Sequence, residues 1–430
     1  MQNKSDQGQV DDSVTHHTIC RVCDSREIDI ALELSPTPLA DMFVPQADAP
    51  KFCKEYPLSV GLCRNCGYLH LSWTLNADLL YPDFVYTTST TVGLINHYRE
   101  YADQMLRMVD LTSSDLIVDI GSNDGSFLQG FLACKSRLQG VEPGRVIAEK
   151  ANKLVPTKCG YFDDNLVDTI LAEHGKATLI TTNYTYANID NILEFSRSVK
   201  RLLADNGLFV VQTGYHPDQM DKCMFDYIYH EHISYFSFGV VKKILAKSGL
   251  EPISVSRNSM KGGSIRIVAQ HVNGDRKIDE TIATMLSEEH SRGVRELATY
   301  RKFSTAIETK GLKLRKLLDD LVATGERIIG YGASHSTTTF LYHYKLKSYL
   351  DYIVDDNLVK QGTVSPGYLI PVYSPTRLNG EQEIFVLILA WQHAENIISR
   401  NSALVDRGVR FILPFPEPHV YGYDSVTAVS

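Results

Sequence analysis

The sequence predicts an α/β protein built around a doubly wound parallel sheet, and three features of the chain lead to that prediction. Residues 115–215 alternate apolar strand-like runs with amphipathic stretches, which is the pattern of a parallel sheet covered by helices on both faces. A second alternation of the same kind runs through residues 326–418. Two tight pairs of cysteines precede both units, so we expect a small cysteine-rich domain in front of two α/β domains.

The length and these patterns together predict four segments. A chain of 430 residues is long enough for roughly two to four domains. We expect a disordered tail over residues 1–15, because this stretch is polar and holds no apolar periodicity. We expect the cysteine-rich domain over residues 16–75, the central α/β domain over residues 76–300, and the C-terminal α/β domain over residues 301–430.

The charge and the hydropathy of the chain argue against two broad classes of partner. The net charge is −8, and the basic runs at 242–243 and 313–316 sit in helical patterns, so nucleic acid is a poor candidate. The chain begins without an apolar targeting segment, and no later apolar run approaches the roughly 18 to 20 residues of a membrane span. We therefore predict a cytoplasmic protein without a membrane partner, either a monomer or a homodimer.

The cysteine spacing predicts a metal centre. Four of the eight cysteines form two Cys-x-x-Cys pairs, which suit a tetrahedral thiolate site for zinc. Two redox pairs or a disulfide framework are the alternatives, but a cytoplasmic setting opposes disulfides and neither pair opens a helix of a βαβ unit. We predict a structural zinc ion without an open coordination position, bound by Cys20, Cys23, Cys63 and Cys66.

The turn after the first central strand, DIGSNDGSF at residues 119–127, is a candidate cofactor-binding loop. Its glycines let the backbone turn tightly at the carboxyl end of the strand, and Glu142 ends the next strand, where a carboxylate can accept hydrogen bonds from both ribose hydroxyls. The G-x-G-x-x-G spacing of a dinucleotide fold is absent, and Asp119 and Asp124 would repel a pyrophosphate but not the cation of S-adenosylmethionine (SAM). We favour a class I methyltransferase over a dehydrogenase or an empty glycine turn. The predicted SAM-binding residues are Asp119, Gly121, Asn123, Gly125, Glu142 and Asn183.

The sequences of the second α/β unit and of the segment before it give less specific predictions of function. Residues 275–322 are charged and helical, and a leucine stripe on one face predicts packing that joins two domains or two chains. The second unit opens with RIIGYG and a Gly-Ala-Ser turn at 332–334 but lacks a full G-x-G-x-x-G. It either binds part of a nucleotide or serves only as a scaffold. The stripe consists of Leu314, Leu317, Leu318 and Leu321.

The stretch DYIYHEHISYF, residues 226–236, places two histidines around one carboxylate. A metal site, an acid/base site and a polar strand edge compete, and no third metal ligand can be identified. The stretch follows the strand at 207–213, so it lies at the carboxyl edge of the sheet, where a histidine near neutral pKa is a suitable base. If the stretch is extended, both histidines point to the same side, and the residues alone do not choose between them. The catalytic candidates are Tyr229, His230, Glu231 and His232.

Motifs along nearly the whole chain, from about residue 16 to 420, resemble those of the sugar-nucleotide C-methyltransferases. In chain order they are the two cysteine pairs, DFVYTTST, DIGSNDGSFL, GVEP, FDYIYHEHISYFS, GGSIRI, GYGAS, KQG and FPEPHV. YHEH together with GGS is the most specific part. The resemblance implies a zinc-binding region, a central SAM-dependent methyltransferase domain and a C-terminal Rossmann-like domain. It also implies methylation of a ring carbon of a nucleoside-diphosphate 4-keto-6-deoxyhexose.

The same resemblance implies roles for single residues. His232 matches the proposed base, Tyr229 and Glu231 match neighbours that line the sugar site, and Tyr86 resembles a tyrosine near the sugar. Lys261, before the GGS turn, and Asn188 are further predicted substrate-binding residues. At two positions the chain differs from many relatives. Asn188 stands where many have a histidine, which affects how the keto oxygen is held. Ser336 stands where many have a lysine, which affects the nucleotide or the sugar.

The implied chemistry needs no metal at the reacting carbon. A 4-keto group acidifies the C3 hydrogen, a neutral histidine takes that proton, and hydrogen-bond donors stabilise the resulting oxyanion. The enolate carbon then receives the methyl group, which requires close positioning of both substrates. Two alternatives remain: a zinc-ribbon methyltransferase acting on nucleic acid or another small molecule, and a non-catalytic SAM-binding scaffold. The stretch Asn-Tyr-Thr-Tyr at 183–186 echoes a nucleic-acid methyltransferase loop but lacks its prolines.

Overall fold

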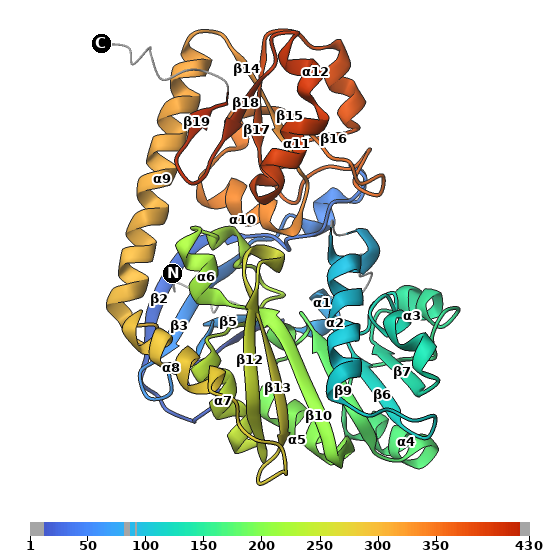
Figure 1. Cartoon of the computed structure of the whole chain (residues 1–430). Coiled ribbons are helices and arrows are strands. Elements are labelled where there is room, and N and C mark those ends of the chain that lie inside the picture. The colour runs from blue at the N-terminus through green and yellow to red at the C-terminus, as the bar shows by residue number, and fades with distance from the viewer. Residues whose placement is uncertain (1–12, 81–86, 91–92, 422–430) are drawn as a thin grey trace, which may run out of the picture.

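The computed structural model describes residues 13–80, 87–90 and 93–421. Figure 1 shows the central sheet in the lower half of the molecule, the C-terminal sheet in the upper half, and the long helix α9 (Leu297–Ala323) alongside both. A small antiparallel sheet from the N-terminal part lies beside the seam of the two halves. In the described part of the chain, no helix combines the length and the apolar character that crossing a membrane requires.

The N-terminal sheet has four antiparallel strands in the order β11-β4-β3-β2. Its outermost strand comes from the stretch DYIYHEHISYF, which lies far along the chain: Ser234 pairs with His70, and Tyr235 pairs with Leu69. The histidine-containing stretch is thus anchored to the domain that holds the cysteine pairs. The strands are β2 (Ile28–Thr37), β3 (Tyr56–Cys63), β4 (Leu69–Leu71) and β11 (Ser234–Tyr235).

Part of the predicted disordered tail belongs to a strand. Val14 and Thr15 belong to β1 (Val14–His16), which pairs with β5 (Trp73–Leu75), so the prediction was wrong for these two residues. The local sequence is polar, and the order comes from a strand partner about sixty residues away, which tail composition does not reveal. Residues 1–12 lie outside the described residues.

The central sheet has seven strands in the order β12-β13-β10-β9-β6-β7-β8. The five strands from β6 to β10 run parallel, as the alternating pattern predicted, whereas β13 and β12 complete the sheet as an antiparallel pair. The strands are β6 (Leu116–Ile120), β7 (Arg137–Glu142), β8 (Thr157–Cys159), β9 (Ala177–Asn183), β10 (Leu203–Gly214), β12 (Leu250–Asn258) and β13 (Ser264–His271).

Helices cover both faces of this sheet because alternate strand residues are apolar on each side. Val118 and Ile180 face one core, whereas Ile117 and Leu179 face the other, which is closed by α2. Consecutive parallel strands end at one edge, so the loops after β6, β9 and β10 gather there. The helices are α2 (Leu94–Met108), α3 (Arg145–Ala151), α4 (Asp164–His174), α5 (Ile192–Leu202), α6 (His216–Asp221), α7 (Phe238–Lys247) and α8 (Thr281–Ser291).

The C-terminal sheet has six strands in the order β16-β15-β14-β17-β18-β19. All neighbours are parallel except β18 and β19, which matches the second α/β unit expected from the sequence. The elements are β14 (Arg327–Tyr331), β15 (Leu350–Val354), β16 (Val372–Tyr373), β17 (Ile384–Ile388), β18 (Arg410–Leu413), β19 (His419–Val420), α10 (His335–His343), α11 (Ala394–Arg400) and α12 (Ser402–Val405).

The leucine stripe of α9 joins parts of one chain. Leu314 and Leu318 are fully buried in a core that also contains Leu32 of the N-terminal sheet and Phe340 of α10. Leu317 and Leu321 pack against the edge of the same core. A second connection lies nearby, where the Lys360 ammonium binds the Asp41 carboxylate at 2.6 Å. The N-terminal and C-terminal domains therefore share one apolar core and a buried ion pair.

Candidate active site and zinc centre

The two cysteine pairs come together at one point. The four sulfur atoms of Cys20, Cys23, Cys63 and Cys66 all lie within 4.8 Å of one another. The Cys20–Cys66 and Cys23–Cys63 sulfur distances are 3.6 and 3.5 Å, close to the about 3.8 Å edge of a tetrahedron with Zn–S bonds of about 2.3 Å. Four thiolates complete a tetrahedral coordination sphere, so the site needs no fifth ligand. The donor set fits a structural zinc ion.

Each pair sits on a tight turn, which explains the two-residue spacing. The backbone N–H of Asp24 bonds to the carbonyl of Cys20, and the N–H of Gly67 bonds to that of Cys63. Gly67 has a φ of +81°, and Asp24 adopts a positive φ of 60°, so both turns need a left-handed residue after the second cysteine. The Lys243 ammonium donates to the carbonyl of Cys66 and brings positive charge next to the thiolates.

The glycine loop after β6 is tightly packed. Gly121 has a φ of +73°, and a Cβ atom there would lie 1.9 Å from the Thr185 hydroxyl oxygen. Gly125, with a φ of +75°, leaves no room for a Cβ beside Val155. Glu142 at the end of β7 accepts hydrogen bonds from the N–H groups of Asn123 (3.0 Å) and Gly144 (2.9 Å). The predicted cofactor loop and the predicted ribose carboxylate are thus joined directly.

Asp119 supports this loop from inside the sheet. Its carboxylate accepts hydrogen bonds from the Thr181 hydroxyl (2.6 Å) and the Asn183 amide (3.1 Å), and only 2% of the residue is exposed. Burial raises the pKa of Asp119 to about 7, against the effect of these two donors. Asp119 and Asn183 therefore form a buried link between β6 and β9.

Unpartnered polar atoms collect at the carboxyl edge of the central sheet. Buried side-chain polar atoms nearly always have a hydrogen-bond partner, so a cluster without partners marks a place where a ligand or water completes the bonding. In the described part of the chain, five of the buried side-chain polar atoms without a partner follow or end β6, β9 and β10. They are Ser122 Oγ, Thr182 Oγ1, Asn183 Oδ1, Gln212 Nε2 and Thr213 Oγ1. This edge therefore fits a polar cofactor.

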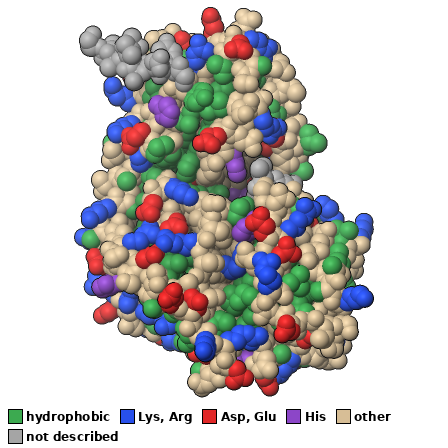
Figure 2. Space-filling model, viewed as in Figure 1, with side chains coloured by type: hydrophobic (Ala, Val, Ile, Leu, Met, Phe, Trp, Pro, Cys, Tyr) green, Lys and Arg blue, Asp and Glu red, His purple; other side chains and the backbone are tan. Residues whose placement is uncertain are grey.

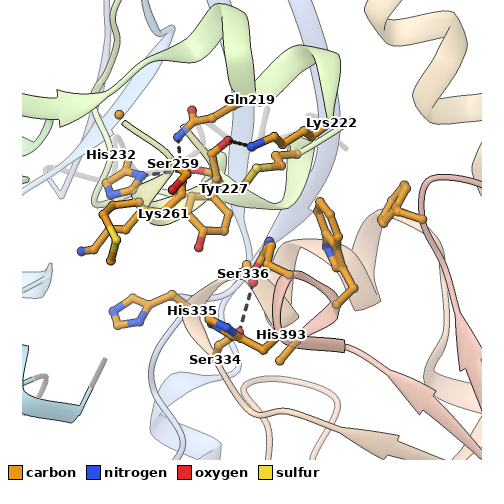
Figure 3. Close-up of a pocket in the computed structure, with 18 of the residues that line it drawn as sticks. Gln219, Lys222, Tyr227, His232, Ser259, Lys261, Ser334, His335, Ser336 and His393 are labelled. Atoms are coloured by element: carbon orange, nitrogen blue, oxygen red, sulfur yellow. Dashed lines mark hydrogen bonds between the residues drawn. The ribbon is translucent and has the colours of Figure 1, made fainter. Parts of the chain in front are cut away.

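A cavity of about 950 Å³ lies between this edge and the C-terminal domain. Figure 2 shows histidine side chains at the waist between the two halves of the molecule. Figure 3 shows His232 and Lys261 on the side of the central domain, and Ser334, His335 and His393 on the side of the C-terminal domain. The cavity is thus walled by the carboxyl edges of two parallel sheets, where α/β proteins bind their ligands.

The histidine-containing stretch is not extended, so the condition under which both histidines would point to the same side is not met. Residues 230–231 form a turn, closed by a hydrogen bond from the His232 N–H to the Tyr229 carbonyl at 3.0 Å. Tyr229 and His232 line the cavity, whereas His230 and Glu231 do not. The residues before the turn are held by the C-terminal domain, since the Asp226 carboxylate accepts a bond from the Trp391 indole at 2.9 Å.

Tyr229 and His232 form a hydrogen-bonded pair. The Tyr229 hydroxyl lies 3.0 Å from His232 Nε2, and His232 Nδ1 lies 3.1 Å from the Tyr227 carbonyl oxygen. A carbonyl only accepts, so Nδ1 carries the ring proton and Nε2 accepts from the tyrosine hydroxyl. Burial lowers the pKa of His232 to about 3, and the Lys261 charge acts in the same direction. The imidazole is therefore neutral at neutral pH and can take up a proton, but its pKa lies well below the near-neutral value expected from the sequence.

His230 and Glu231 lie behind the cavity wall. His230 is fully buried, with Nε2 3.3 Å from the Pro57 carbonyl oxygen and its ring edge-on to Tyr56. Burial lowers its pKa to about 4. Glu231 is 6% exposed, and burial raises its pKa to about 7. Neither side chain faces the cavity, and His230 holds the turn against the N-terminal domain.

The three predicted substrate-binding residues, Tyr86, Asn188 and Lys261, differ in where they lie relative to the cavity. Lys261 lines the cavity from a turn with a positive φ of 48°, and its ammonium lies 4.3 Å from the centre of the Tyr184 ring. Asn188 follows the cavity-lining Ala187, and its buried Oδ1 has no partner in the described part of the chain. Tyr86 lies outside the described residues.

The sequence analysis did not identify the residues that the C-terminal domain contributes to the cavity. A usable signal exists, because each group follows a strand of the second α/β unit: GASHS follows β14, and AWQHAEN follows β17. Side chains after parallel strands meet at one edge. The missed cavity residues of the C-terminal domain include Ser334, His335, Trp391, Gln392 and His393; Tyr227 of the central domain was missed as well, whereas Ser336 was named only as a departure from the family pattern.

The strand order, the glycine loop and the polar edge define a class I methyltransferase fold. Comparison with known proteins agrees. Three matching families are described as a zinc binding domain (residues 20–81), a methyltransferase domain (residues 95–255) and a C-methyltransferase C-terminal domain (residues 259–416). C-methyltransferase NovU of Streptomyces niveus is 33% identical over 408 residues, which are 94% of this chain and 97% of NovU. The chain therefore belongs to the C-methyltransferase family, and it is a SAM-dependent enzyme with a structural zinc centre.

Solved structures are similar to part of the chain. A SAM-dependent methyltransferase from Clostridium acetobutylicum is similar over 41% of this chain and 92% of its own, with 11% identity and a TM-score of 0.34. CalS10, an amino pentose methyltransferase from Micromonospora echinaspora, is similar over 41% of this chain and 90% of its own, with 12% identity and a TM-score of 0.32.

Proposed function

We propose that this C-methyltransferase acts on a nucleoside-diphosphate 4-keto-6-deoxy sugar and methylates C3 through an enolate. The observation that supports this proposal is the Tyr229–His232 pair, which lines a cavity bounded by the carboxyl edges of two parallel sheets. A cavity of about 950 Å³ is at the upper end of the roughly 300–1,000 Å³ typical of small-molecule sites, so it can take an extended nucleotide sugar. The two sheet edges allow the reacting sugar and the nucleotide to lie on opposite walls.

The proton of C3 passes to the Tyr229–His232 pair. The Tyr227 carbonyl holds the ring proton on Nδ1, so Nε2 of His232 is the nitrogen that takes up a proton. The Tyr229 hydroxyl already donates to Nε2 and can relay the transfer: it gives its proton to His232 as it accepts the one from C3. The electron pair of the broken C–H bond moves into the enolate, so charge is balanced between enolate and imidazolium. General-base assistance of this kind contributes about 10² to 10⁴ in rate.

The enolate oxygen needs a nearby positive charge or donor. Lys261 lines the cavity, and its charge is close enough to lower the pKa of His232, so the ammonium stands near the base. A preorganised cation at that place stabilises the developing oxyanion. Asn188 follows the cavity-lining Ala187 and, by the family resemblance, stands where many relatives carry a histidine. Lys261 is therefore our candidate for the group that holds the keto oxygen.

SAM binds at the carboxyl edge of the central sheet and, when bound, supplies the methyl group that the enolate carbon receives. Glu142 is the candidate ribose acceptor, because both of its oxygens are already fixed by loop N–H groups and keep further lone pairs. The glycine loop brings its backbone close to the cofactor, and the partnerless atoms of Asn183 and Ser122 offer further hydrogen bonds.

A panel of nucleotide-activated keto sugars with methyl-labelled SAM tests this proposal. We expect transfer of the label to a 4-keto-6-deoxy sugar and a carbon–carbon bond at C3, assigned by NMR of the product. Label at C5, the other carbon beside the ketone, would correct the position and keep the enolate chemistry. Transfer to none of the keto sugars would overturn the substrate class. Salt-dependent binding to nucleic acid would favour the alternative acceptor. The cytoplasmic location stays a prediction.

A further inference from the structure

Arg266 is a buried cation near the carboxyl edge of the central sheet, and the proposed proton transfer does not use it. It belongs to β13, and only 7% of the residue is exposed. Its guanidinium carbon lies 3.5 Å from the centre of the Tyr101 ring, and Nη1 donates to Gln104 Oε1 at 2.6 Å. Tyr101 and Gln104 are three positions apart on α2, the helix that closes this face of the sheet. The cation is therefore held in place between the helix and the sheet.

The charge of Arg266 has no acidic partner in the described part of the chain. Its hydrogen-bond partners there are Gln104, Gln212 and the ring of His97, and it forms no ion pair. Burial lowers the pKa of Arg266, and the ionisable groups that oppose this effect most are tyrosines. A guanidinium stays protonated at neutral pH, and burying it without a counter-charge costs free energy. An anion that binds close to it recovers part of that cost.

Gln212 connects this cation to the edge of the sheet. Arg266 donates to Gln212 Oε1 from Nε at 3.1 Å and from Nη2 at 2.8 Å. Because both donors hold the amide oxygen, the amide nitrogen points away from the guanidinium. Gln212 Nε2 is buried and has no hydrogen-bond partner among the described residues. A cation at the oxygen also polarises the amide, which makes its N–H groups stronger donors.

Gln212 lies beside Asn183, a residue that the sequence predicts to bind SAM. The two residues are register partners on β10 and β9, and Asn183 Oδ1 is a buried acceptor that likewise has no partner in the described chain. An open donor and an open acceptor therefore lie on neighbouring strands. An α-amino acid group matches this pair, because its carboxylate accepts hydrogen bonds and its ammonium donates them. The methionine part of SAM ends in such a group.

The phosphates of a sugar nucleotide are a less suitable source of the anion. Thr213, the next residue of β10, lines the cavity, whereas Gln212 and Arg266 do not. Successive residues of a strand point to opposite faces, so the Gln212 amide and the Thr213 hydroxyl serve different sides of the sheet. The open donor of Gln212 therefore belongs with Asn183 and the cofactor loop.

We propose that Gln212 Nε2 binds the carboxylate in the methionine part of SAM, and that Arg266 is its positioning residue, which holds the amide oxygen and supplies the counter-charge. Asn183 Oδ1 accepts from the ammonium of the same group. The proposal concerns the cofactor alone, so it goes beyond the proposed function and does not depend on the identity of the sugar. A site of this kind disfavours a cofactor analogue without the carboxylate, because the buried N–H is then left unmatched.

Calorimetric binding of S-adenosylhomocysteine and of its decarboxylated analogue, which keeps the ammonium, tests the proposal without a sugar. The wild-type protein should prefer S-adenosylhomocysteine by about 10- to 100-fold, the range expected for one hydrogen bond to a charged group. Gln212→Leu should abolish this preference by weakening the binding of S-adenosylhomocysteine alone. Gln212→Glu should invert it, because the introduced carboxylate repels that of the ligand and pairs with Arg266, which maintains the fold.

Variants of Arg266 test its positioning role. Arg266→Gln should lower the preference about tenfold, and Arg266→Lys, which keeps the charge, should restore part of it. Gln139→Leu is the matched control, because Gln139 is a buried glutamine of the same sheet whose amide bonds to backbone carbonyls of Gly140 and Pro156. This variant should keep the full preference. Gln212→Glu gives the answer even if Arg266→Gln does not fold.

The outcomes separate this proposal from the proposed function. Equal affinities of the wild-type protein for the two ligands would overturn the role of Gln212. So would an equal loss for both ligands in Gln212→Leu, which would mark a structural role, or an unchanged preference in Gln212→Glu. Failure to methylate any keto sugar would overturn the proposed function and leave the role of Gln212 in place, because the binding is measured without a sugar.

Discussion

The carboxyl edges of the two parallel sheets are built alike but are prepared for different tasks. In both sheets a carboxylate that follows the second strand fixes the loop that follows the first strand. Glu142 accepts from the N–H groups of Asn123 and Gly144, and Asp355 accepts from those of Ala333 and Asn357. The backbone arrangement is therefore the same, and it cannot by itself explain why one edge binds a cofactor.

The difference lies in the side chains. The edge of the central sheet has buried polar atoms without partners, at Ser122, Asn183 and Thr213 for example. Among the described residues of the C-terminal domain no buried side-chain polar atom lacks a partner, and Ser334 and Thr337 bond to each other and to the backbone in a capping box. Buried polar atoms without hydrogen-bond partners can bind a polar ligand. An edge whose polar atoms all have partners forms a rigid wall of the cavity instead. The cavity needs both.

The largest expected effect comes from removing the metal, because β11 connects the histidine turn to the zinc-bearing sheet. Purified protein should contain about one zinc per chain, and replacing Cys20 and Cys63 with Ser should remove it. Structural zinc in small domains has apparent binding free energies of about 10 to 16 kcal/mol, so the N-terminal sheet should unfold and activity should be lost. Replacing Cys159, an exposed cysteine outside the site, is the control. A metal-free protein with an unchanged unfolding midpoint would contradict the structural role.

The next largest effect distinguishes the proposed base, His232, from His230 in the same turn. Replacing His232 with Asn should lower kcat by about 10² to 10⁴ and leave SAM affinity nearly unchanged, because the cofactor binds other residues. His230→Asn is the matched control: it should cost stability through the lost bond to Pro57 and have a smaller effect on kcat. Calorimetry with SAM and steady-state kinetics measure both quantities. A larger loss of kcat in the His230 variant would reverse the assignment.

A smaller effect tests the comparison of the two edges directly. Glu142→Ala should weaken SAM binding by about 1 to 3 kcal/mol, the cost of leaving buried donors unmet. Asp355→Ala removes the equivalent carboxylate from the other edge and should lower the stability of the C-terminal domain without changing SAM affinity. Calorimetric titration and denaturant unfolding of both variants give the answer. Equal losses of SAM affinity would show that both edges contribute to the cofactor site.

The last expected effect is a pH dependence of stability that comes from Asp226, at the seam between the two edges. Burial raises the pKa of Asp226 from its ordinary 3.8 to about 7, so the folded protein keeps a proton that the unfolded chain releases above pH 4. The unfolding free energy should therefore fall as pH rises from about 4 to about 7, by at most about 1.4 kcal/mol per pH unit for this group. Asp226→Asn should make that slope shallower, whereas Asp110→Asn, at an exposed position, should not. Denaturant midpoints across this pH range measure it, and an unchanged slope would contradict the burial of Asp226.

The comparison also shows what the sequence could and could not predict. The alternation of strands and helices and the positions of the glycines were sufficient to predict the central sheet, because parallel strands and the loops at their ends follow from local sequence patterns. The paired cysteines were sufficient for the metal centre. The turn at His230 could not be read locally: Tyr229, His230, Glu231 and His232 include no turn-forming Gly, Pro or Asn. It forms because His230 bonds to Pro57 and β11 pairs with β4, both distant in sequence.

The cavity wall of the C-terminal domain could have been anticipated in part. His335 follows the strand in RIIGYG, which the sequence pattern identified, and Trp391 follows β17, so their place at an edge could have been predicted. Their meeting with the central domain depends on α9 and on the Asp41–Lys360 pair, which bring distant segments together. Contacts of that kind arise from tertiary packing and leave no periodic signal in the chain.

Exchange of the C3 hydrogen with deuterated solvent tests the central claim most directly. The 4-keto nucleotide sugar is incubated with enzyme and S-adenosylhomocysteine, so that deprotonation can occur without methyl transfer, and exchange at C3 is followed by NMR. The account predicts rapid exchange at C3 with the wild-type enzyme and a fall of about 10²-fold or more in His232→Asn. Exchange that continues at the wild-type rate in this variant would contradict the claim that the Tyr229–His232 pair removes the proton.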